Sequence, residues 1–567
     1  MKAQRLFLLL AIILVLFGLI FGFISCSNPQ QTASLTPTVV SVFPENNASA
    51  VNPSASLRAT FSGDMDPASL SSSTFLLSSA EGSATGVVSY DSASKTAAFS
   101  PLIKLASATT YTATISDQVK DLQGNRMASP YSWYFTTVGL ISAVGTPDAS
   151  FGTNGIVIYD SGSVIPGTEN DSDDYGNAAA IDDAGRILIA GSFKGDVLRY
   201  NANGESDNSF SGNLGWGYGL TSPWLRLWNA LIIDQNGKIL IAGGSHDSSS
   251  DERRDNMTVV RLNTDGNTDG SFGDSGKFFY DTMLEKTSSN SKSEGRAITI
   301  DSAGRILVTG ISSILTSNGA ENLPTPCNMV WRINPDGKSL DSTFGDGGKI
   351  IAGGQAVRVD SGGAIIALGP TTIAKYDNNG KNLDNAFGNG GIVDYQRYYA
   401  GPKGLEPAPT SGNSMAVDPS GKILVAGYSL DYSGGTAVKQ MTLWRFNSDG
   451  GTDNGFGANG TVTDKNSEDG SANSAVIDSL GRILVVGKRW EGSCHDMVIW
   501  RYDSSGNLDS GFGKGGIVTS DVNSVLNRYP GYDSAGNSIV LDASGRIVVT
   551  GCITVPHGSD MVIWRYK

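Results

Sequence analysis

Residues 477–487 read IDSLGRILVVG, residues 497–502 read MVIWRY, and residues 509–516 read DSGFGKGG. The first two stretches are apolar runs bounded by turn-forming or charged residues, a pattern typical of short strands. In the phrase Asp-x-x-Gly, the glycine can take a positive φ and close a tight hairpin between two strands. These stretches therefore predict short antiparallel strands joined by glycine turns.

The three phrases recur in the same order along residues 151–567. The phrase Asp-x-x-Phe-Gly-x-x-Gly places its aromatic residue at Phe151, Phe272, Phe344, Phe387, Phe456 and Phe512, with a degenerate copy at Phe210. The phrase Ile-Asp-x-x-Gly begins at Ile181, Ile233, Ile300, Val359, Val417, Ile477 and Leu541. Seven copies of about 60 residues each indicate a repeat architecture.

Each repeat is interpreted as four strands, and seven such units favour a seven-bladed β-propeller. The alternative, an open solenoid, needs atypical polar end repeats, whereas both end repeats of this chain are ordinary. The phrases resemble the bacterial delta-60 repeat, and more loosely the NHL class of propeller repeat, over residues 146–567. The resemblance implies that residues 139–567 form the propeller.

The phase of the repeat predicts how the propeller closes. The repeats begin with a single strand, Phe151–Ile158, and end with Met561–Tyr566, which has no following strand. Pairing of the first repeat strand with the last would remove two free sheet edges. We therefore expect these two segments to lie side by side.

Residues 37–138 alternate short apolar runs with turn residues, as in a small β-sandwich. This segment resembles the bacterial Ig-like domain through FSGDMD at 61–66, FSP at 99–101, YTATI at 111–115, VKDLQGN at 119–125 and WYFTT at 133–137. The resemblance implies a spacer or adhesion module, so the whole fold class is all-β. Asp64, Asp66 and Asp121 suggest either a Ca²⁺ site or turn caps, and we favour caps.

The N-terminus reads as a targeting signal. Lys2 and Arg5 precede the uncharged run Leu6–Ile24, and residues 23–26 (FISC) resemble a bacterial lipobox. The resemblance implies a lipoprotein signal peptide over 1–25, lipidation of Cys26 and a flexible polar tether over 26–36. The alternatives are an uncleaved N-terminal anchor and plain secretion. Each places the rest of the chain outside the cytoplasm.

Composition limits the function classes. The 567-residue chain has 71 glycines and a net charge of −14. A nucleic-acid-binding protein usually carries a basic patch, so this acidity argues against nucleic acid as the partner. The sequence contains no Gly-x-Ser-x-Gly motif and no phosphate-binding loop.

The sequence gives only weak indications of metal binding or of thiol chemistry. Cys327, Cys494 and Cys552 are widely spaced, and the sequence does not show whether two of them form a disulfide. His495 and His557 lie in corresponding loops, where solvated histidines are commoner than a metal site. Recurring Asn-x-Asp-Gly turns suggest Ca²⁺ only weakly, because Asx hydrogen bonds explain the pattern. We therefore predict no metal and no cofactor.

Loop length indicates where a partner binds. The turns after the first and third strands of each repeat are short and alike, whereas the other two connections are long and varied. Varied loops on a rigid scaffold often bind ligands. The candidate binding residues are Trp216, Tyr218, Trp224, Arg226, Trp228, Tyr395, Arg397, Tyr398 and Tyr399. The alternative is that these aromatic side chains pack the loops onto the propeller, as we expect for Trp331, Trp444, Trp500 and Trp564 of the third strands.

A second recurring position precedes or opens the first strand of each repeat. It is occupied by Asn177, Asn229, Arg296, Gln355, Asn413, Asn473 and Asn537. These residues are predicted to form a polar collar at the mouth of the central channel. A collar of this kind could hold a ligand, or its amides could satisfy backbone groups of neighbouring strands, which is the role we favour.

These features lead to one main hypothesis and two alternatives. The main hypothesis is a bacterial lipoprotein of the cell envelope, in the outer membrane or at the cell surface, whose propeller binds an envelope or extracellular protein or glycan. The first alternative is a propeller hydrolase or lyase acting on extracellular polysaccharide. The second is a purely structural envelope protein. Fold alone does not decide among them.

Overall fold

The computed structural model describes residues 36–53, 55–138, 144–161, 173–192, 197–212, 214, 226–246, 255–280, 293–314, 325–401, 404–432, 437–465, 468–520, 532–556 and 558–567. The described chain forms two compact units: the second holds Thr136–Lys567 with the short stretches Ser49–Ser56 and Lys104–Thr109, and the first holds the rest. Cys26 and the predicted signal peptide and tether lie outside the described residues, as do Trp216, Tyr218, Trp224 and His557. Within the described residues, no helix is long and apolar enough to span a bilayer.

The first unit is a β-sandwich. One sheet has the order β1(Val39–Phe43), β3(Leu57–Phe61), β7(Thr96–Pro101), β6(Gly86–Asp91). The other has the order β2(Ala48–Val51), β9(Tyr131–Thr137), β8(Thr110–Ile115), β4(Phe75–Ser79), β5(Gly82–Ala84), and one short 3-10 helix, η1, covers Pro67–Ser69. Strand β3 alternates buried and partly exposed side chains, because successive residues of a strand face opposite sides. The sandwich that the sequence predicts is therefore present.

Aromatic rings fill the core of this sandwich. The ring of Phe75 lies 5.8 Å from that of Trp133 and 5.5 Å from that of Phe99, and all three side chains are buried. Asp121 caps a turn, since its carboxylate accepts hydrogen bonds from the backbone N–H groups of Gln123 and Asn125 and from the Asn125 side chain. Asp66 caps η1 by accepting from the N–H of Ala68. These contacts match the capping role expected for the two aspartates.

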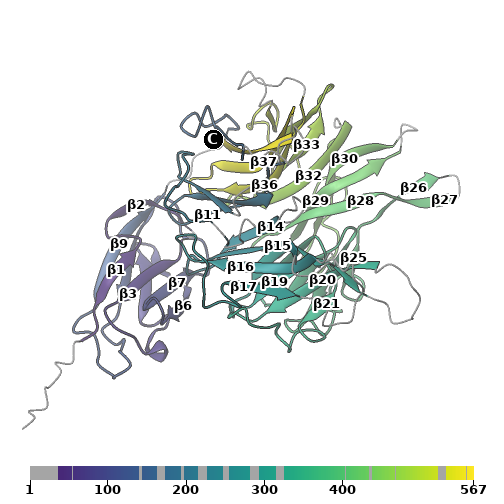
Figure 1. Ribbon diagram of the computed structural model, residues 1–567. Coiled ribbons are helices and arrows are strands. Elements are labelled where there is room, and N and C mark those ends of the chain that lie inside the picture. Colours follow the sequence, from purple (N-terminus) through teal and green to yellow (C-terminus); the bar gives the residue numbers. More distant parts are fainter. Residues whose placement is uncertain are drawn as a thin grey trace, which may run out of the picture. The chain divides into compact units, whose positions relative to one another are not determined.

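The second unit contains, within its described residues, seven antiparallel sheets of three or four strands (Figure 1), which we number in chain order. Sheet 1 is β11(Tyr175–Ile181), β12(Ile187–Ser192), β13(Val197–Tyr200); sheet 2 is β14(Arg226–Ile233), β15(Ile239–His246), β16(Asp255–Leu262), β17(Lys277–Tyr280); sheet 3 is β18(Ser293–Ile300), β19(Ile306–Ile314), β20(Thr325–Ile333), β21(Lys349–Ile351). Sheet 4 is β22(Ala356–Val359), β23(Ile365–Leu368), β24(Thr372–Tyr376), β25(Ile392–Asp394).

The remaining sheets follow the same plan. Sheet 5 is β28(Thr410–Val417), β29(Ile423–Asp431), β30(Val438–Phe446), β31(Thr461–Thr463); sheet 6 is β32(Glu468–Ile477), β33(Ile483–Trp490), β34(His495–Tyr502), β35(Ile517–Ser520). Sheet 7 is β36(Ser534–Leu541), β37(Ile547–Val555), β38(Gly558–Tyr566), β10(Ile156–Tyr159). Strand β10 pairs with β38 from Ile156 opposite Trp564 to Tyr159 opposite Met561, which is the strand pairing expected from the phase of the repeat.

The recurring phrases build each sheet in the same way. The glycine of every Asp-x-x-Gly turn has a positive φ, for example +77° at Gly185. In that turn the Asp182 carboxylate accepts hydrogen bonds from the N–H groups of Ala184 and Arg186. The third-strand tryptophans Trp331, Trp444, Trp500 and Trp564 are buried, as the sequence predicts.

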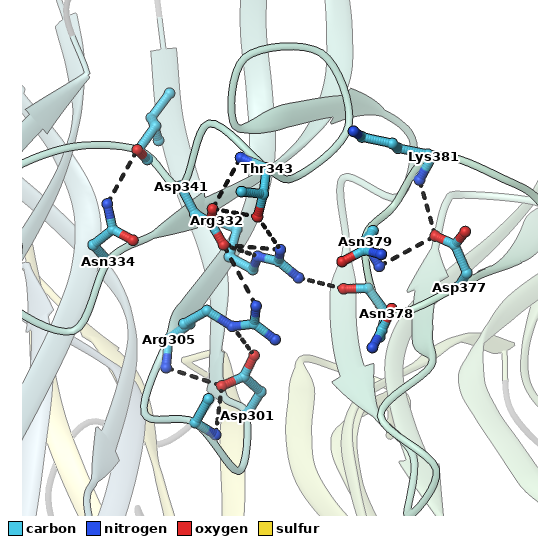
Figure 2. Close-up of polar contacts among 12 residues, drawn as sticks. Asp301, Arg305, Arg332, Asn334, Asp341, Thr343, Asp377, Asn378, Asn379 and Lys381 are labelled. Carbon is cyan, nitrogen blue, oxygen red and sulfur yellow. Dashed lines mark hydrogen bonds and ion pairs between the residues drawn. The ribbon is translucent and has the colours of Figure 1, made fainter.

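A recurring polar network lies at one end of every sheet, and in five sheets its arginine also donates to a carbonyl of the next sheet; Figure 2 shows it for sheet 3. The Arg332 guanidinium donates to the Asp341 carboxylate from Nε (2.9 Å), stacks 4.5 Å from the centre of the Phe344 ring, and donates from Nη1 to the carbonyl of Asn378 in sheet 4. The pairs that correspond to Arg332 and Asp341 are Arg199–Asp207, Arg261–Asp269, Lys375–Asp384, Arg445–Asp453, Arg501–Asp509 and Arg565–Asp148.

The residue after each recurring aromatic residue, a glycine in six copies and Ser211 in the seventh, adds a backbone hydrogen bond to the neighbouring repeat. The N–H of Gly345 in sheet 3 donates to the carbonyl of Asn379 in sheet 4 at 2.8 Å. The corresponding bonds are Ser211 to Asp265, Gly273 to Asp336, Gly388 to Asp449, Gly457 to Ser505, Gly513 to Val144 and Gly152 to Asn203. We call the end of the sheets that carries these bonds and the Asp-x-x-Gly turns the turn end, and the opposite end the loop end.

Candidate functional site

The loop end carries a separate two-stranded hairpin between sheets 4 and 5. It consists of β26(Arg397–Gly401) and β27(Gly404–Ala408), and Figure 1 shows it beyond the ends of β28 and β29. In this hairpin Tyr398 lies opposite Pro407, and Tyr399 lies opposite Glu406. Since directly opposed residues share a face, the hairpin has two faces of different composition.

The inner face fastens the hairpin to sheet 5. The Tyr399 ring stacks on Tyr432 with their centroids 3.9 Å apart and an interplanar angle of 8°. The Tyr399 hydroxyl donates to the Glu406 carboxylate (2.9 Å), and this hydrogen bond raises the pKa of Tyr399. Arg397 donates to the Ser429 hydroxyl of β29 at 3.3 Å. These contacts fix the hairpin in one orientation.

The outer face is apolar and exposed. Tyr398 is 58% exposed, Leu405 is 79% exposed, and Pro407 is also exposed. Leu405 and Pro407 are two residues apart on β27, so they point to the same side as Tyr398. Large apolar side chains grouped on a surface often mark a contact site for another protein.

Two residues predicted for the binding face are instead in the core. Trp228 is 1% exposed and packs with Val260 and Leu231 between sheets 1 and 2. Tyr395 is 6% exposed, lies 5.1 Å from the Trp444 ring, and donates its hydroxyl to the carbonyls of Gly369 and Pro370. Burial raises the pKa of Tyr395.

The predictions for Trp228 and Tyr395 as exposed anchors are therefore wrong. Both residues lie close to a strand end and directly follow an exposed residue, Leu227 or Asp394, and sequence spacing alone did not fix which side of the strand faces the core. Arg226, another predicted binding residue, is the first residue of β14.

A second feature of the loop end centres on His495, the first residue of β34. Its Nε2 lies 2.9 Å from the carboxylate of Asp469 in β32, and its Nδ1 lies 3.3 Å from that of Asp533, which directly precedes β36. The His495 backbone N–H also donates to Asp533, at 2.8 Å. The imidazole thus joins sheet 6 to sheet 7.

Charged and aromatic side chains surround this imidazole. Lys439 of sheet 5 lies 3.9 Å from the Asp469 carboxylate, and Trp490 meets the His495 ring edge-on at 5.2 Å. Burial raises the pKa of Asp533, but hydrogen bonds from His495 and its charge outweigh burial, so the net pKa is lowered. We call Asp469, Trp490, His495 and Asp533 the His495 cluster.

The thiols contribute no cross-link here. Cys327, Cys494 and Cys552 do not form a disulfide. Burial raises the pKa of the Cys552 thiol to about 11, so at neutral pH this residue is not a thiolate nucleophile. Within the described part of the chain, no group of three His, Cys, Asp or Glu side chains has the geometry to hold a metal ion.

Six of the seven predicted collar residues share one backbone position. The first two strands of six sheets have a β-bulge, and the extra residue is Asn177, Asn229, Arg296, Asn413, Asn473 or Asn537. Gln355 precedes β22 and donates its N–H to the Leu368 carbonyl. Every residue of this set is partly exposed.

The asparagine amides at these bulges connect neighbouring sheets. Each donates to a backbone carbonyl of the next sheet: Asn177 to Trp228, Asn229 to Gly295, Asn413 to Ala472, Asn473 to Gly536 and Asn537 to Gly176. These bonds are the backbone-satisfying role that we favoured for the asparagines. A β-bulge re-aims a side chain, which explains how one residue per sheet reaches its neighbour.

Sequence reasoning missed several residues of the loop end. Leu405, Pro407 and Tyr432 were not singled out, although the alternation around a Gly401–Gly404 turn predicts a hairpin. The sequence also did not predict Asp469, Trp490 and Asp533 as site residues, because strand pairing and the contact between neighbouring sheets bring them to His495. No local motif marks such a cluster.

Comparison with known families agrees with this architecture. The bacterial Ig-like domain model matches residues 33–137. The model described as a domain of unknown function (DUF5122) beta-propeller matches residues 185–210, 235–272, 419–456 and 481–512. The chain carries a bacterial Ig-like domain followed by a DUF5122 β-propeller region. Each propeller match runs from an Asp-x-x-Gly turn to the aromatic residue of the following Asp-x-x-Phe phrase, or to Phe210 in the degenerate copy.

Solved structures give weaker likenesses. Virginiamycin B lyase from Staphylococcus aureus is 10% identical, over 72% of this chain and 98% of that chain, with a TM-score of 0.35. Polysaccharide lyase Uly1 is 10% identical, over 76% of this chain and 100% of that chain, with a TM-score of 0.38. The N-terminal part of the bacterial S-layer protein SbsC is 17% identical, over 41% of this chain and 42% of that chain, with a TM-score of 0.20.

These TM-scores are low, so the fold described here rests on strand pairing and the family matches. The chain spans less than half of the S-layer protein fragment. The search of curated proteins found no match.

Proposed function

We propose that the seven sheets are the blades of a closed seven-bladed propeller. Inter-sheet bonds support this proposal, because they run from each sheet to its successor and also from sheet 7 to sheet 1. The latter are Gly152 to Asn203, Arg565 to the Ala202 carbonyl, and Asn537 to Gly176. The pairing of β10 with β38 supplies the fourth strand of sheet 7.

The propeller is held at the bacterial cell surface by a lipid on Cys26, with the tether and Ig-like domain between lipid and propeller. The lipobox-like residues 23–26 and the polar segment after them support this part of the proposal. Cells fed radiolabelled fatty acid should label the chain, and Cys26→Ala should abolish the label. Label that persists in Cys26→Ala would exclude this anchor.

The loop end binds an envelope or extracellular protein. The propeller catalyses no reaction on this partner. The observation that carries this proposal is the β26–β27 hairpin, which is fixed by its inner face and presents Tyr398, Leu405 and Pro407 to solvent. Leucine and proline side chains offer no hydrogen bonds, so their natural partner is an apolar protein surface rather than a glycan. A hairpin already ordered before binding loses little conformational entropy on association.

The His495 cluster does not favour the hydrolase or lyase alternative. A general base needs a nitrogen or oxygen that faces its substrate. Both ring nitrogens of His495 face carboxylates of the protein itself. An imidazole engaged in this way positions its neighbours and is not poised to take a proton from a substrate.

The proposed function is tested by crosslinking on living cells, followed by binding of purified candidates to the purified chain. Tyr398→Ala combined with Leu405→Ala should weaken partner binding by about tenfold or more, because aromatic and apolar anchors dominate most interfaces. Leu480→Ala is the matched control, since Leu480 is 66% exposed but lies in a turn at the turn end. Equal binding by all variants would exclude the hairpin as the contact site and leave a structural envelope role.

A further inference from the structure

The His495 cluster has the components of a separate ligand site. It combines an exposed aromatic residue and two half-exposed carboxylates from sheets 6 and 7, and Lys439 of sheet 5 lies beside it. Trp490 is 37% exposed, and the side chains of Asp469 and Asp533 are each 53% exposed. His495 itself is mostly covered, with 12% of its side chain exposed.

His495 lies between the two carboxylates and orients them through its ring nitrogens and its backbone N–H. One Asp469 oxygen faces Nε2, while Asp533 uses one oxygen for the ring and the other for the His495 backbone N–H. Each carboxylate oxygen has two lone pairs, so acceptor sites remain available toward solvent on both residues. Acceptors that are already oriented need no rearrangement when a hydroxyl group binds.

Trp490 is held beside these acceptors. Its ring makes a T-shaped contact with His495, at an interplanar angle of 75°. The contact fixes the indole while more than a third of the residue stays in solvent. A fixed, exposed indole offers a flat apolar surface for the C–H groups of a ligand, beside groups that bind its hydroxyls.

The backbone at Asp469 is strained. Its φ is +50°, a conformation that non-glycine residues rarely adopt, and it lies in a β-bulge between Glu468 and Ser471 of β32. The adjacent Gly470 could have taken this conformation without strain. Strain retained at a residue whose side chain completes a polar cluster points to a role for that carboxylate.

We propose that the His495 cluster binds a neutral glycan, with Trp490 against the face of one pyranose ring and Asp469 and Asp533 accepting hydrogen bonds from its hydroxyls. Lys439, 3.9 Å from Asp469, supplies a donor for another hydroxyl. The carboxylates of Asp469 and Asp533 accept hydrogen bonds but donate none, so they pair with sugar hydroxyls and not with the carboxylates of uronic acids or with sulfate groups, which sets the preference for uncharged sugars. This site is separate from the hairpin and does not depend on a protein partner.

Binding is measured with the full chain in detergent, first on an array of glucose, mannose and galactose oligosaccharides with their uronate counterparts, then by titration calorimetry. Trp490→Ala and Asp533→Asn should each weaken neutral-glycan binding by about tenfold or more. Leu480→Ala at the opposite end and Tyr398→Ala on the hairpin should leave it unchanged. The Tyr398 variant thereby separates failure of this site from failure of the hairpin.

Asp469→Gly separates binding from folding. It removes the carboxylate but relieves the positive φ, so the melting temperature should stay the same or rise while glycan binding falls by about tenfold. The proposal is overturned if no neutral glycan binds, if uronates bind as tightly, or if the Trp490 and Asp533 variants bind like the unchanged chain.

Discussion

The turn end and the loop end of the repeat sheets use the same residue types for different purposes. At the turn end, arginine, aspartate and phenylalanine form nearly the same contacts in six of the seven sheets, as Arg332, Asp341 and Phe344 do in sheet 3 (Figure 2), and Lys375 replaces the arginine in sheet 4. At the loop end, Arg397, Asp469 and Tyr399 each occur in contacts that no other described sheet repeats. Recurring contacts hold the scaffold together, and non-recurring contacts are where a specific function is expected.

The largest effect should come from breaking one turn-end network. Arg332 is 1% exposed and its partner Asp341 is 7% exposed, so Arg332→Met leaves a buried carboxylate with only the more distant guanidinium of Arg305, at 3.5 Å. Loss of one partner of a buried pair destabilises a protein by about 3–5 kcal/mol. The free energy of unfolding is measured by urea denaturation with tryptophan fluorescence.

A matched variant sharpens this test. Arg332→Lys keeps the charge but loses the bond to the Asn378 carbonyl, and sheet 4 already carries lysine at the equivalent position, Lys375. It should be less destabilising than Arg332→Met. Equal stability of all three proteins would show that the recurring network is not what holds the sheets together.

The strands and glycine turns of the turn end were the part of the structure most accessible from sequence, whereas the contacts among Arg332, Asp341 and Phe344 were not predicted. The phrase that contains Phe272, Phe344 and Phe456 occurs seven times, so its pattern is easy to detect. Its glycine turns need a conformation that few other residues tolerate. Sequence thus predicted the strands, the order of the sheets and the pairing of the first repeat strand with the last.

The contacts at the loop end could not be predicted from the sequence in this way. Trp228 and Tyr395 are residue types that often anchor an interface, yet strand pairing directs their side chains into the core. His495, Asp469 and Asp533 meet only because sheets 6 and 7 are neighbours. Contacts made once, between residues distant in sequence, leave no repeated pattern to detect.

The next effect concerns the joint between the two ends of the repeat region. Asp148 lies before β10 and is fully buried against Arg565 of β38 (2.9 Å). Burial raises its pKa, but hydrogen bonds from Ser150 and the charges of Arg565 and Lys567 outweigh burial and lower the pKa from 3.8 to about 2. The ionised carboxylate therefore stabilises the fold above pH 3.8, and this contribution is lost as the pH falls toward 2.

The expected contribution is about 2 kcal/mol at neutral pH. It is measured as the difference in unfolding free energy between the unchanged chain and Asp148→Asn, at about pH 6 and again near pH 2. The difference should shrink by about that amount at the lower pH. A difference that stays constant with pH would mean that the Asp148 carboxylate does not stabilise the joint.

A smaller effect distinguishes a closed ring from an open row of sheets. Asn537 donates to Gly176 across the joint of sheets 7 and 1, whereas Asn413 donates to Ala472 between sheets 5 and 6. In a closed ring, Asn537→Ala and Asn413→Ala should each destabilise the protein by about 1 kcal/mol. If only Asn413→Ala has an effect in urea denaturation, the ring is open in solution.

The smallest effect on stability belongs to the hairpin. Tyr398 is 58% exposed, and the contacts that fasten the hairpin use Tyr399 and Arg397 instead. Tyr398→Ala should therefore change the unfolding free energy by no more than about 0.5 kcal/mol. Tyr399→Ala, which removes the stack on Tyr432, is the paired variant and should expose the hairpin to proteolysis in its 401–404 turn. A large loss of stability in Tyr398→Ala would mean that its side chain belongs to the scaffold, and the hairpin would then no longer qualify as a surface kept for a partner.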